Sequence, residues 1–309
     1  MKGVLSILAL LTVFQGQVLY QDPSHDLVLS GKGVTNWSGE TLDNGDLSFR
    51  ASGDPLVLEA KNQGATITTP RLNGTFASAK GADGKTMTYA KVLHAEGGTT
   101  TVFDGQAAYA GDIAKAQRLK QPTPPEPKEI SKGTLKTDHF DYAGSQESGT
   151  FTLPVAFDVT SDTKGMIEPK KKGDPVKAFL QNMEMHGSSG VINLNPGSKD
   201  KKDFLKTGHI EGPITFHMDR SESVAGAPFA SVGKLDGQAD KLDLDLVTER
   251  TVTLSGHVKL NGDLPNYISV TGGEKAVLKL NDAGEIVSVT FTGSPTTSTI
   301  KEKKGGGKR

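Results

Sequence analysis

Histidines and carboxylates are the residues of this sequence that are best suited to chemistry. The chain contains 7 histidines and no cysteine. The histidines are His25, His94, His139, His186, His209, His217 and His257. None belongs to an HExxH motif, and His209 and His217 would stand about 26 Å apart in one extended strand, too far to share a metal ion unless the chain turns back. We therefore expect solvated or hydrogen-bonded histidines on strands rather than a metal site.

The carboxylates and serines give no stronger indication of catalysis. Asp243 and Asp245 share a face in KLDLDL, where they could bind calcium or exchange protons, but an outward polar strand face predicts the same residues. Gly-Ser-Ser-Gly at 187–190 is not the G-x-S-x-G of a nucleophile elbow. Trp37 is the single tryptophan, so an aromatic platform for nucleic acid is not expected. These residues indicate neither a metal site nor a nucleic-acid partner, and without a GxGxxG or Walker A motif they give no sign of a cofactor.

Strands are the elements that must position these side chains. In TVTLSGHVKLNGD (251–263), Val252, Leu254, Val258 and Leu260 share one parity, so an extended strand places them on one face. Similar alternation recurs at 45–51, 55–61, 101–111, 149–159, 241–247, 276–280 and 285–291. The predicted hairpin turns are Asn44-Gly45, Asn73-Gly74, Asp83-Gly84, Asp236-Gly237, Asn261-Gly262 and Asp282-Ala283-Gly284. Asn-Gly and Asp-Gly supply the positive φ that tight hairpins require.

Composition supports an all-β chain. Hydrophobic residues make up 35%, aromatic residues 6%, and there are 37 glycines, a balance that favours short strands and tight turns over helical bundles. Two short helices are predicted, at 175–185, with Asp174 as N-cap, and more weakly at 111–120. Lys and Arg (35) nearly balance Asp and Glu (36), so no global field favours nucleic acid or an anionic surface.

The order of segments along the chain predicts an exported protein. Residues 1–20 read as a secretory signal peptide, because Lys2 precedes an apolar stretch that is shorter than the ~20 residues of a spanning helix; an uncleaved anchor is the alternative. A β segment (21–120), a proline-rich linker (121–130) and a second β segment (131–295) follow. The basic residues 296–309 are predicted to form a flexible tail, and the protein is predicted to be periplasmic.

Two stretches carry a family resemblance. LDLDLVTERTVTLSGHVKLNGD followed by AVLKLNDAGEIVSVTFTGSP resembles the repeats of the OstA-like (LptA-like) proteins of lipopolysaccharide transport. Leu254-Ser255-Gly256-His257-Val258 corresponds to their central element, and the segment from Ile286 to Gly293 to their closing strand. In 133–159, Leu153-Pro154 replaces an expected glycine, and 160–235 fits poorly. The recognisable motif covers 237–295.

The resemblance implies an elongated, twisted two-sheet β-jellyroll with an apolar groove between its sheets. It also implies a non-enzymatic periplasmic protein of outer-membrane biogenesis that binds lipopolysaccharide or a similar acylated glycolipid. Envelope transport proteins, or further copies of the chain, would then join through edge strands. From the alternation we expect the groove to be lined by Leu242, Leu244, Leu246, Val252, Leu254, Val258, Leu260, Leu278, Leu280, Val287, Val289 and Phe291.

Two other functions are compatible with the same alternation. A secreted structural or adhesive β-repeat scaffold would use the apolar face only as core. A carbohydrate-active β-helix would need acidic residues clustered in one groove.

Overall fold

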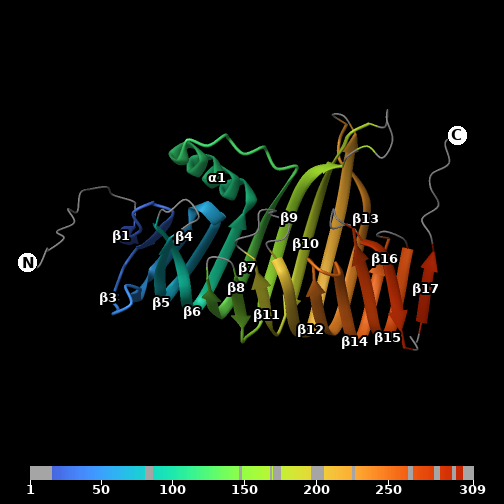
Figure 1. Ribbon diagram of the computed structural model, residues 1–309. Coiled ribbons are helices and arrows are strands. Elements are labelled where there is room, and N and C mark those ends of the chain that lie inside the picture. The colour runs from blue at the N-terminus through green and yellow to red at the C-terminus, as the bar shows by residue number, and fades with distance from the viewer. Residues whose placement is uncertain are drawn as a thin grey trace, which may run out of the picture.

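The computed structural model describes residues 16–80, 86–145, 148–167, 169, 175–195, 205–224, 227–263, 267–281, 286–293 and 297–301. These residues form strands, one short 3-10 helix and one α-helix, so the predicted all-β class is confirmed. The strands follow one another along an elongated molecule, with β1 and β17 at opposite ends (Figure 1).

The described elements have the following bounds. The N-terminal part contains β1 (Gln17–Gln21), β2 (Leu27–Gly31), β3 (Asn36–Thr41), β4 (Leu47–Ala60), the 3-10 helix η1 (Lys61–Gln63), β5 (Ala65–Lys80), β6 (Thr86–Asp104) and α1 (Gly105–Leu119). The middle part contains β7 (Glu129–Gly144), β8 (Gly149–Leu153), β9 (Phe157–Ile167), β10 (Lys177–Gly187), β11 (Ser189–Leu194) and β12 (Leu205–Val224). The C-terminal part contains β13 (Ala230–Asp245), β14 (Thr251–Gly262), β15 (Tyr267–Leu280), β16 (Ile286–Thr292) and β17 (Thr297–Lys301).

All strands belong to one 17-stranded sheet in which the described pairings are antiparallel. In the middle of the molecule β7 pairs with both β8 and β9, while β12 pairs with both β10 and β11. Because β8 also pairs with β11, and β9 with β10, these strands close a six-membered ring. The remaining strands extend this ring in both directions.

Each long strand is interrupted near its middle by a shift in register. The shifts fall between Ser52 and Leu56 on β4, Thr68 and Arg71 on β5, Glu96 and Thr99 on β6, Glu211 and Ile214 on β12, and Ser255 and Val258 on β14. Bulges of this kind bend a strand and increase its local twist. Prolines and glycines occupy several of these positions, where a ladder hydrogen bond is already absent.

Buried threonines hold the bend on three neighbouring strands. Thr69 Oγ1 donates to carbonyl oxygens of Arg71 and Glu96, both at 3.1 Å. Thr99 Oγ1 donates to Thr69 Oγ1 at 3.1 Å, and Thr137 Oγ1 donates to the carbonyl of His139 at 3.0 Å. These hydroxyls satisfy polar groups that the interrupted ladder leaves without partners.

Two cross-strand rows of mainly apolar residues run along the molecule, one on each side of the bend. The first row runs from Tyr20 through Leu29, Leu58, Ile67, Thr101, Leu135, Val159, Met185, Phe216, Gly237 and Leu260 to Val270. The second row runs from Gly39 through Phe49, Gly74, Leu93, Tyr142, Phe151, Ile192, Gly208, Leu244, Val252 and Leu278 to Val289. Their apolar members belong to a single hydrophobic core or pack against it.

Aromatic contacts join the two sides of the bend directly. Tyr20 of the first row lies 4.9 Å, between ring centroids, from Phe76 on the other half of β5. Phe103, near the end of β6, meets Phe151 of the second row edge-on at 6.1 Å. The two halves of the bent sheet therefore face each other across one shared interior.

The proline-rich segment 121–130 joins neighbouring strands of this sheet. Strand β6, which precedes it, pairs with β7, which follows it, along most of their length. The β segments before and after the linker are thus parts of one continuous sheet. Helix α1 fills the connection and lies beside the N-terminal strands in Figure 1.

The strand predicted at 101–111 is wrong beyond Asp104, because helix α1 begins at Gly105. Asp104 ends β6 and caps the helix, because its side chain accepts hydrogen bonds from the backbone N–H groups of Gln106 and Ala107. The helix predicted at 111–120 therefore exists but begins earlier, at Gly105. Its close contact with η1 depends on glycine, since a Cβ at Gly111 would lie 2.6 Å from the Lys61 carbonyl oxygen.

The helix predicted at 175–185 is wrong, because β10 occupies Lys177–Gly187 and pairs with β9 on one edge and β12 on the other. Two full ladders outweigh a weak local helix preference. Of the predicted turns, Asn44-Gly45 lies between β3 and β4 as expected, whereas Asp83-Gly84 and 282–284 lie outside the described residues. Asn73-Gly74, Asp236-Gly237 and Asn261-Gly262 lie within strands instead.

The predicted terminal segments also overlap strands. Residues 1–15 of the predicted signal peptide lie outside the described residues, and Gln17–Gln21 form β1, which pairs with β2. Within the predicted tail 296–309, Thr297–Lys301 form β17, which pairs with β15. Residues 302–309 lie outside the described part.

A substitution at Gly74 tests how closely the second row packs against the neighbouring strand. A Cβ at this position would overlap the Val92 carbonyl oxygen, a backbone atom that cannot move aside without shifting β6. We expect Gly74→Ala to lower the free energy of unfolding by about 1–3 kcal/mol in urea denaturation. Gly133→Ala is the matched control, because its Cβ would meet only the Thr160 oxygen at 3.8 Å. Equal effects of the two substitutions would contradict this packing.

Candidate functional site

The strongest candidate site is the apolar interior between the two rows. Among the residues predicted to line a groove, the fully buried ones belong to the core. They are Leu242, Leu254, Val258, Leu260 and Leu278. Leu244, Val252, Val289 and Phe291 are half-buried and pack against that core. The alternation in the sequence therefore identified the inward face of β13, β14 and β15.

Val287 does not lie on this inward face. A register shift on β16 places Ile286 opposite Leu280 and Val289 opposite Leu278, so that Val287 falls on the bulge. Its side chain is 52% exposed. Leu246 and Leu280 are half-buried, and Leu246 lies just beyond β13, where its N–H donates to the Lys206 carbonyl. Strand parity alone could not reveal the bulge.

Sequence reasoning missed the part of the interior formed by β9, β10 and β12. Val159, Met185 and Phe216 occupy adjacent positions of the first row, and Ile210 and Ile214 are fully buried. The helix predicted over β10 hid the alternation of Phe179, Met183 and Met185. Period-two spacing across 177–187 was the signal that would have identified them.

One polar atom lies unpaired within the first row. Thr101, between Ile67 and Leu135, is 1% exposed, and its Oγ1 has no hydrogen-bond partner in the described part of the chain. A buried hydroxyl without a partner costs about 1–3 kcal/mol. Thr101 therefore marks the one described position where the interior offers an unused hydrogen-bonding group.

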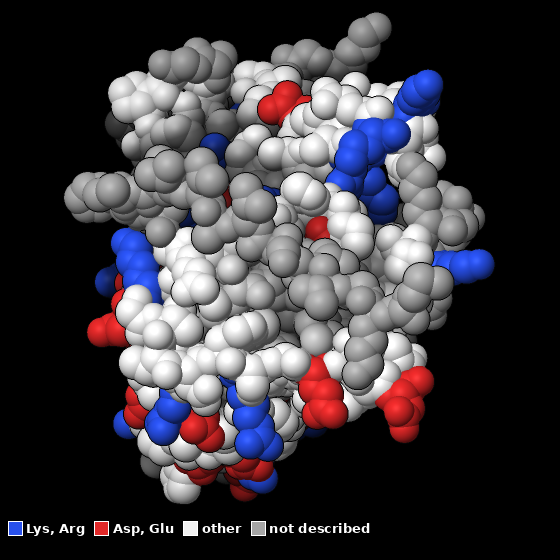
Figure 2. Space-filling model, turned by 90° about the vertical axis from the view of Figure 1, so that its left-hand side faces the viewer, with Lys and Arg blue, Asp and Glu red and all other residues white. Residues whose placement is uncertain are grey.

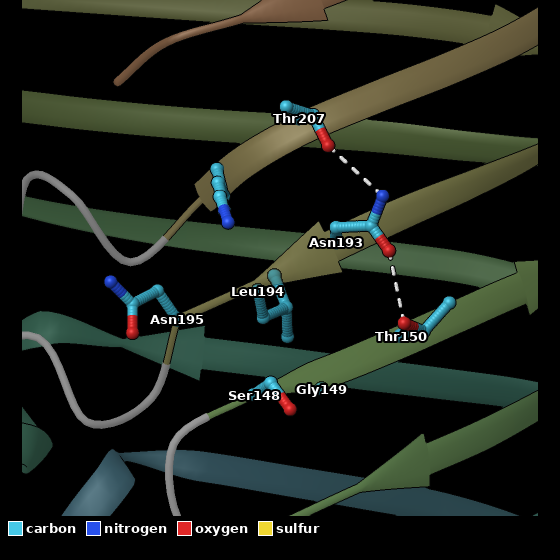
Figure 3. Close-up of a pocket in the computed structure, with 8 residues that line it drawn as sticks. Ser148, Gly149, Thr150, Asn193, Leu194, Asn195 and Thr207 are labelled. Atoms are coloured by element: carbon cyan, nitrogen blue, oxygen red, sulfur yellow. Dashed lines mark hydrogen bonds between the residues drawn. The ribbon is translucent and has the colours of Figure 1, made fainter. Parts of the chain in front are cut away.

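A separate pocket, lined by both polar and apolar groups, lies at the ends of β8, β11 and β12. It has a volume of about 250 Å³. Asn193 lies between two threonines and joins them: Thr150 Oγ1 donates to the Asn193 amide oxygen and the Asn193 amide nitrogen donates to Thr207 Oγ1, each at 2.9 Å (Figure 3). Lys206 is the ionisable side chain among its described lining residues, so the pocket presents no acid–base pair.

The histidines form cross-strand pairs with carboxylates. The Nδ1 contacts are His94–Asp141, His139–Glu96, His186–Asp158, His209–Asp243, His217–Asp236 and His257–Asp240. Within the described residues, no group of three or more potential ligands is arranged to hold a metal ion. Asp243 is engaged by His209, whereas Asp245 accepts backbone hydrogen bonds from Thr248 and Glu249, so these two acids do not act as a pair.

Charges of both signs surround the N-terminal end of the molecule. In the view onto this end, Lys and Arg lie next to Asp and Glu along the lower margin, and neither sign covers the visible face (Figure 2). Among the described helices, none combines the length and apolarity required to cross a membrane.

No protein-family model matches the chain, and neither a curated protein nor a solved structure matches it significantly. The resemblance to OstA-like proteins therefore stays a prediction. What the molecule itself defines is an all-β protein with one elongated apolar interior.

Thr101 and Thr99 give a matched test of the interior, since both are buried on β6. Thr101→Val should raise the free energy of unfolding by about 1 kcal/mol, because it replaces an unpaired hydroxyl with a methyl group of similar size. Thr99→Val should lower it by a similar amount, because it removes the hydrogen bond to Thr69. Urea denaturation measures both changes, and the same sign for both would contradict this assignment.

Proposed function

We propose that the protein is a non-enzymatic, periplasmic lipid-binding protein of the lipopolysaccharide transport or outer-membrane assembly type. Its ligand would be lipopolysaccharide or a similar acylated glycolipid, with the acyl chains held in the apolar interior. The chain would fold as a twisted two-sheet β-jellyroll of the OstA-like kind, and its partners would be envelope transport proteins.

The continuity of the two apolar rows is the observation that carries this proposal. They cross the molecule strand by strand and reach β15 and β16, where Val289 and Phe291 are only half-buried. An apolar interior with a partly exposed end has the chemistry that acyl chains require. Such a ligand needs no directional contacts, because burial contributes about 0.8 kcal/mol per methylene.

Lipid entry would require part of this packing to be exchanged. Leu254, Val258 and Leu260 are buried against neighbouring side chains. Acyl chains would replace some of these contacts as the two halves of the bent sheet separate. The unpaired Thr101 hydroxyl would then be available to a polar group of the lipid, such as an ester or hydroxyl oxygen.

The alternative is a secreted structural or adhesive scaffold without a ligand. The observation that favours it is that the described part of the sheet has unpaired strand edges. Among the described strands, β3 pairs only with β4 and β16 only with β15. Unpaired edges invite strand addition by another copy or an envelope protein. The same side-chain burial that would line a groove would then serve only as core.

Native mass spectrometry of the gently purified protein distinguishes the two functions. The carrier predicts bound acylated lipid, whereas the scaffold predicts lipid-free protein that self-associates. We expect Val289→Asp to reduce retained lipid by about tenfold or more, since a charge beside an acyl chain is costly. Val287→Asp on the same strand is the control, because Val287 is exposed.

Retention of equal lipid by these two variants would overturn the groove assignment. Leu254→Asp should also abolish lipid binding, but Leu254 is 0% exposed, so its loss of binding must be separated from loss of folding. Circular dichroism of each variant provides that separation.

A further inference from the structure

The outer face of β12 carries two histidines that each lie between two carboxylates. His209 Nδ1 lies 2.6 Å from Asp243 Oδ1, and its Nε2 lies 3.0 Å from Glu211 Oε1. His217 Nδ1 lies 2.5 Å from Asp236 Oδ1, and its Nε2 lies 2.6 Å from Asp219 Oδ2. In both cases one carboxylate belongs to β13 and the other to β12 itself.

This geometry fits only one protonation state. A neutral imidazole has a single N–H, so one of its two nitrogens would face a carboxylate oxygen with a lone pair. An imidazolium donates from both nitrogens and satisfies both carboxylates. The positions of these two histidines therefore favour the charged form.

The charged groups around each histidine have a net acidic character. On the neighbouring strand β10, Glu184 lies opposite His217. On β13, Lys234 lies opposite Asp219. On the neighbouring strand β11, the uncharged Val191 lies opposite His209. Lys241 on β13 binds Glu211 at 3.0 Å and partly offsets the acids beside His209.

The ladder between β12 and β13, called the seam below, joins the six-stranded ring to the C-terminal strands. β12 completes the six-stranded ring through β10 and β11, and β13 begins the C-terminal extension of β14 to β17. Both histidines lie in this one ladder, on either side of its register shift at Glu211 and Ile214. Any change in its strength therefore acts on the junction between ring and extension.

We infer that the β12–β13 seam is an acid-strengthened junction, in which protonation of His209 and His217 locks the C-terminal strands onto the ring. At alkaline pH each neutral imidazole keeps one N–H and loses one of its two charge-assisted hydrogen bonds, so the junction opens more readily. The junction is thus sensitive to pH in the range in which histidine titrates.

The direction of the effect follows from the pKa values of the groups involved. Hydrogen bonds to Asp243, which has the larger effect, and to Glu211 raise the pKa of His209 above 6.5. Hydrogen bonds to Asp236, again with the larger effect, and to Asp219 raise the pKa of His217 in the same way. A raised pKa gives stability that is fully present below 6.5 and is lost as pH rises through the folded value. Hydrogen bonding to His209 lowers the pKa of Glu211, whose contribution is lost as pH falls through that lowered value.

Urea denaturation of the full-length, lipid-free protein at about pH 6 and about pH 8.5 tests the junction. We expect a higher midpoint at the lower pH for the wild type. The double variant His209→Gln/His217→Gln should lose most of that difference, because glutamine keeps hydrogen-bonding ability but cannot take a proton. His257→Asn is the control, since His257 is 87% exposed at its side chain and contacts one carboxylate.

Hydrogen exchange, corrected for the intrinsic pH dependence of the rate, localises the effect. Acidification should increase amide protection in β12 and β13 more than in β4 and β5. The inference is overturned if the double variant keeps the wild-type pH difference, if the control loses it equally, or if protection changes uniformly along the sheet. Each readout uses lipid-free protein and is therefore independent of the proposed lipid binding.

Discussion

The architecture depends on one constraint: each long strand must bend near its middle and still present apolar side chains inward on both sides of the bend. A one-residue register shift would reverse the faces of everything beyond it. On β14, two register irregularities lie between Ser255 and Lys259, and Val252, Leu254, Val258 and Leu260 nevertheless remain on the inward side. The threonines at the bend of β5, β6 and β7 satisfy groups that the interrupted ladder releases. Because the bend recurs on successive strands, two rows form and one interior lies between them.

Sequence periodicity predicted the part of this arrangement that depends on faces within a strand. It identified most of the inward residues of β13, β14 and β15, because apolar and polar residues alternate on each side of the bulges. It failed where a long-range contact decides the local structure. Asn73-Gly74 is a common hairpin signal, yet Gly74 stands mid-strand, because β5 pairs there with both β4 and β6. Glycine is needed at this position since no Cβ fits against the Val92 carbonyl. Residues 177–187 have weak helical character as well as period-two spacing, and the ladders with β9 and β12 decide in favour of a strand.

Spatial neighbours explain two further features of the chain. The proline-rich segment 121–130 is predicted to be a semi-rigid connector between two β segments, since its prolines remove backbone donors. Pairing of β6 with β7 makes it a connection between adjacent strands, and no local property of the segment contains that information. The exposure of Val287 has the same origin, because the bulge that turns it outward is defined only by the register of β16 against β15.

The two faces of β12 show how period-two spacing separates chemistry from packing within one strand. Ile210, Ile214 and Phe216 point toward the shared interior, while His209 and His217 meet carboxylates on the outer face. The inward apolar residues and the outward histidines are linked, because all of them lie in the same ladder with β13. If the interior must open along its length to admit an acyl chain, the strands on each side of an opening must part or slide. Under the inferred pH dependence, protonated His209 and His217 would hold the β12–β13 ladder together, so such an opening would occur elsewhere along the interior.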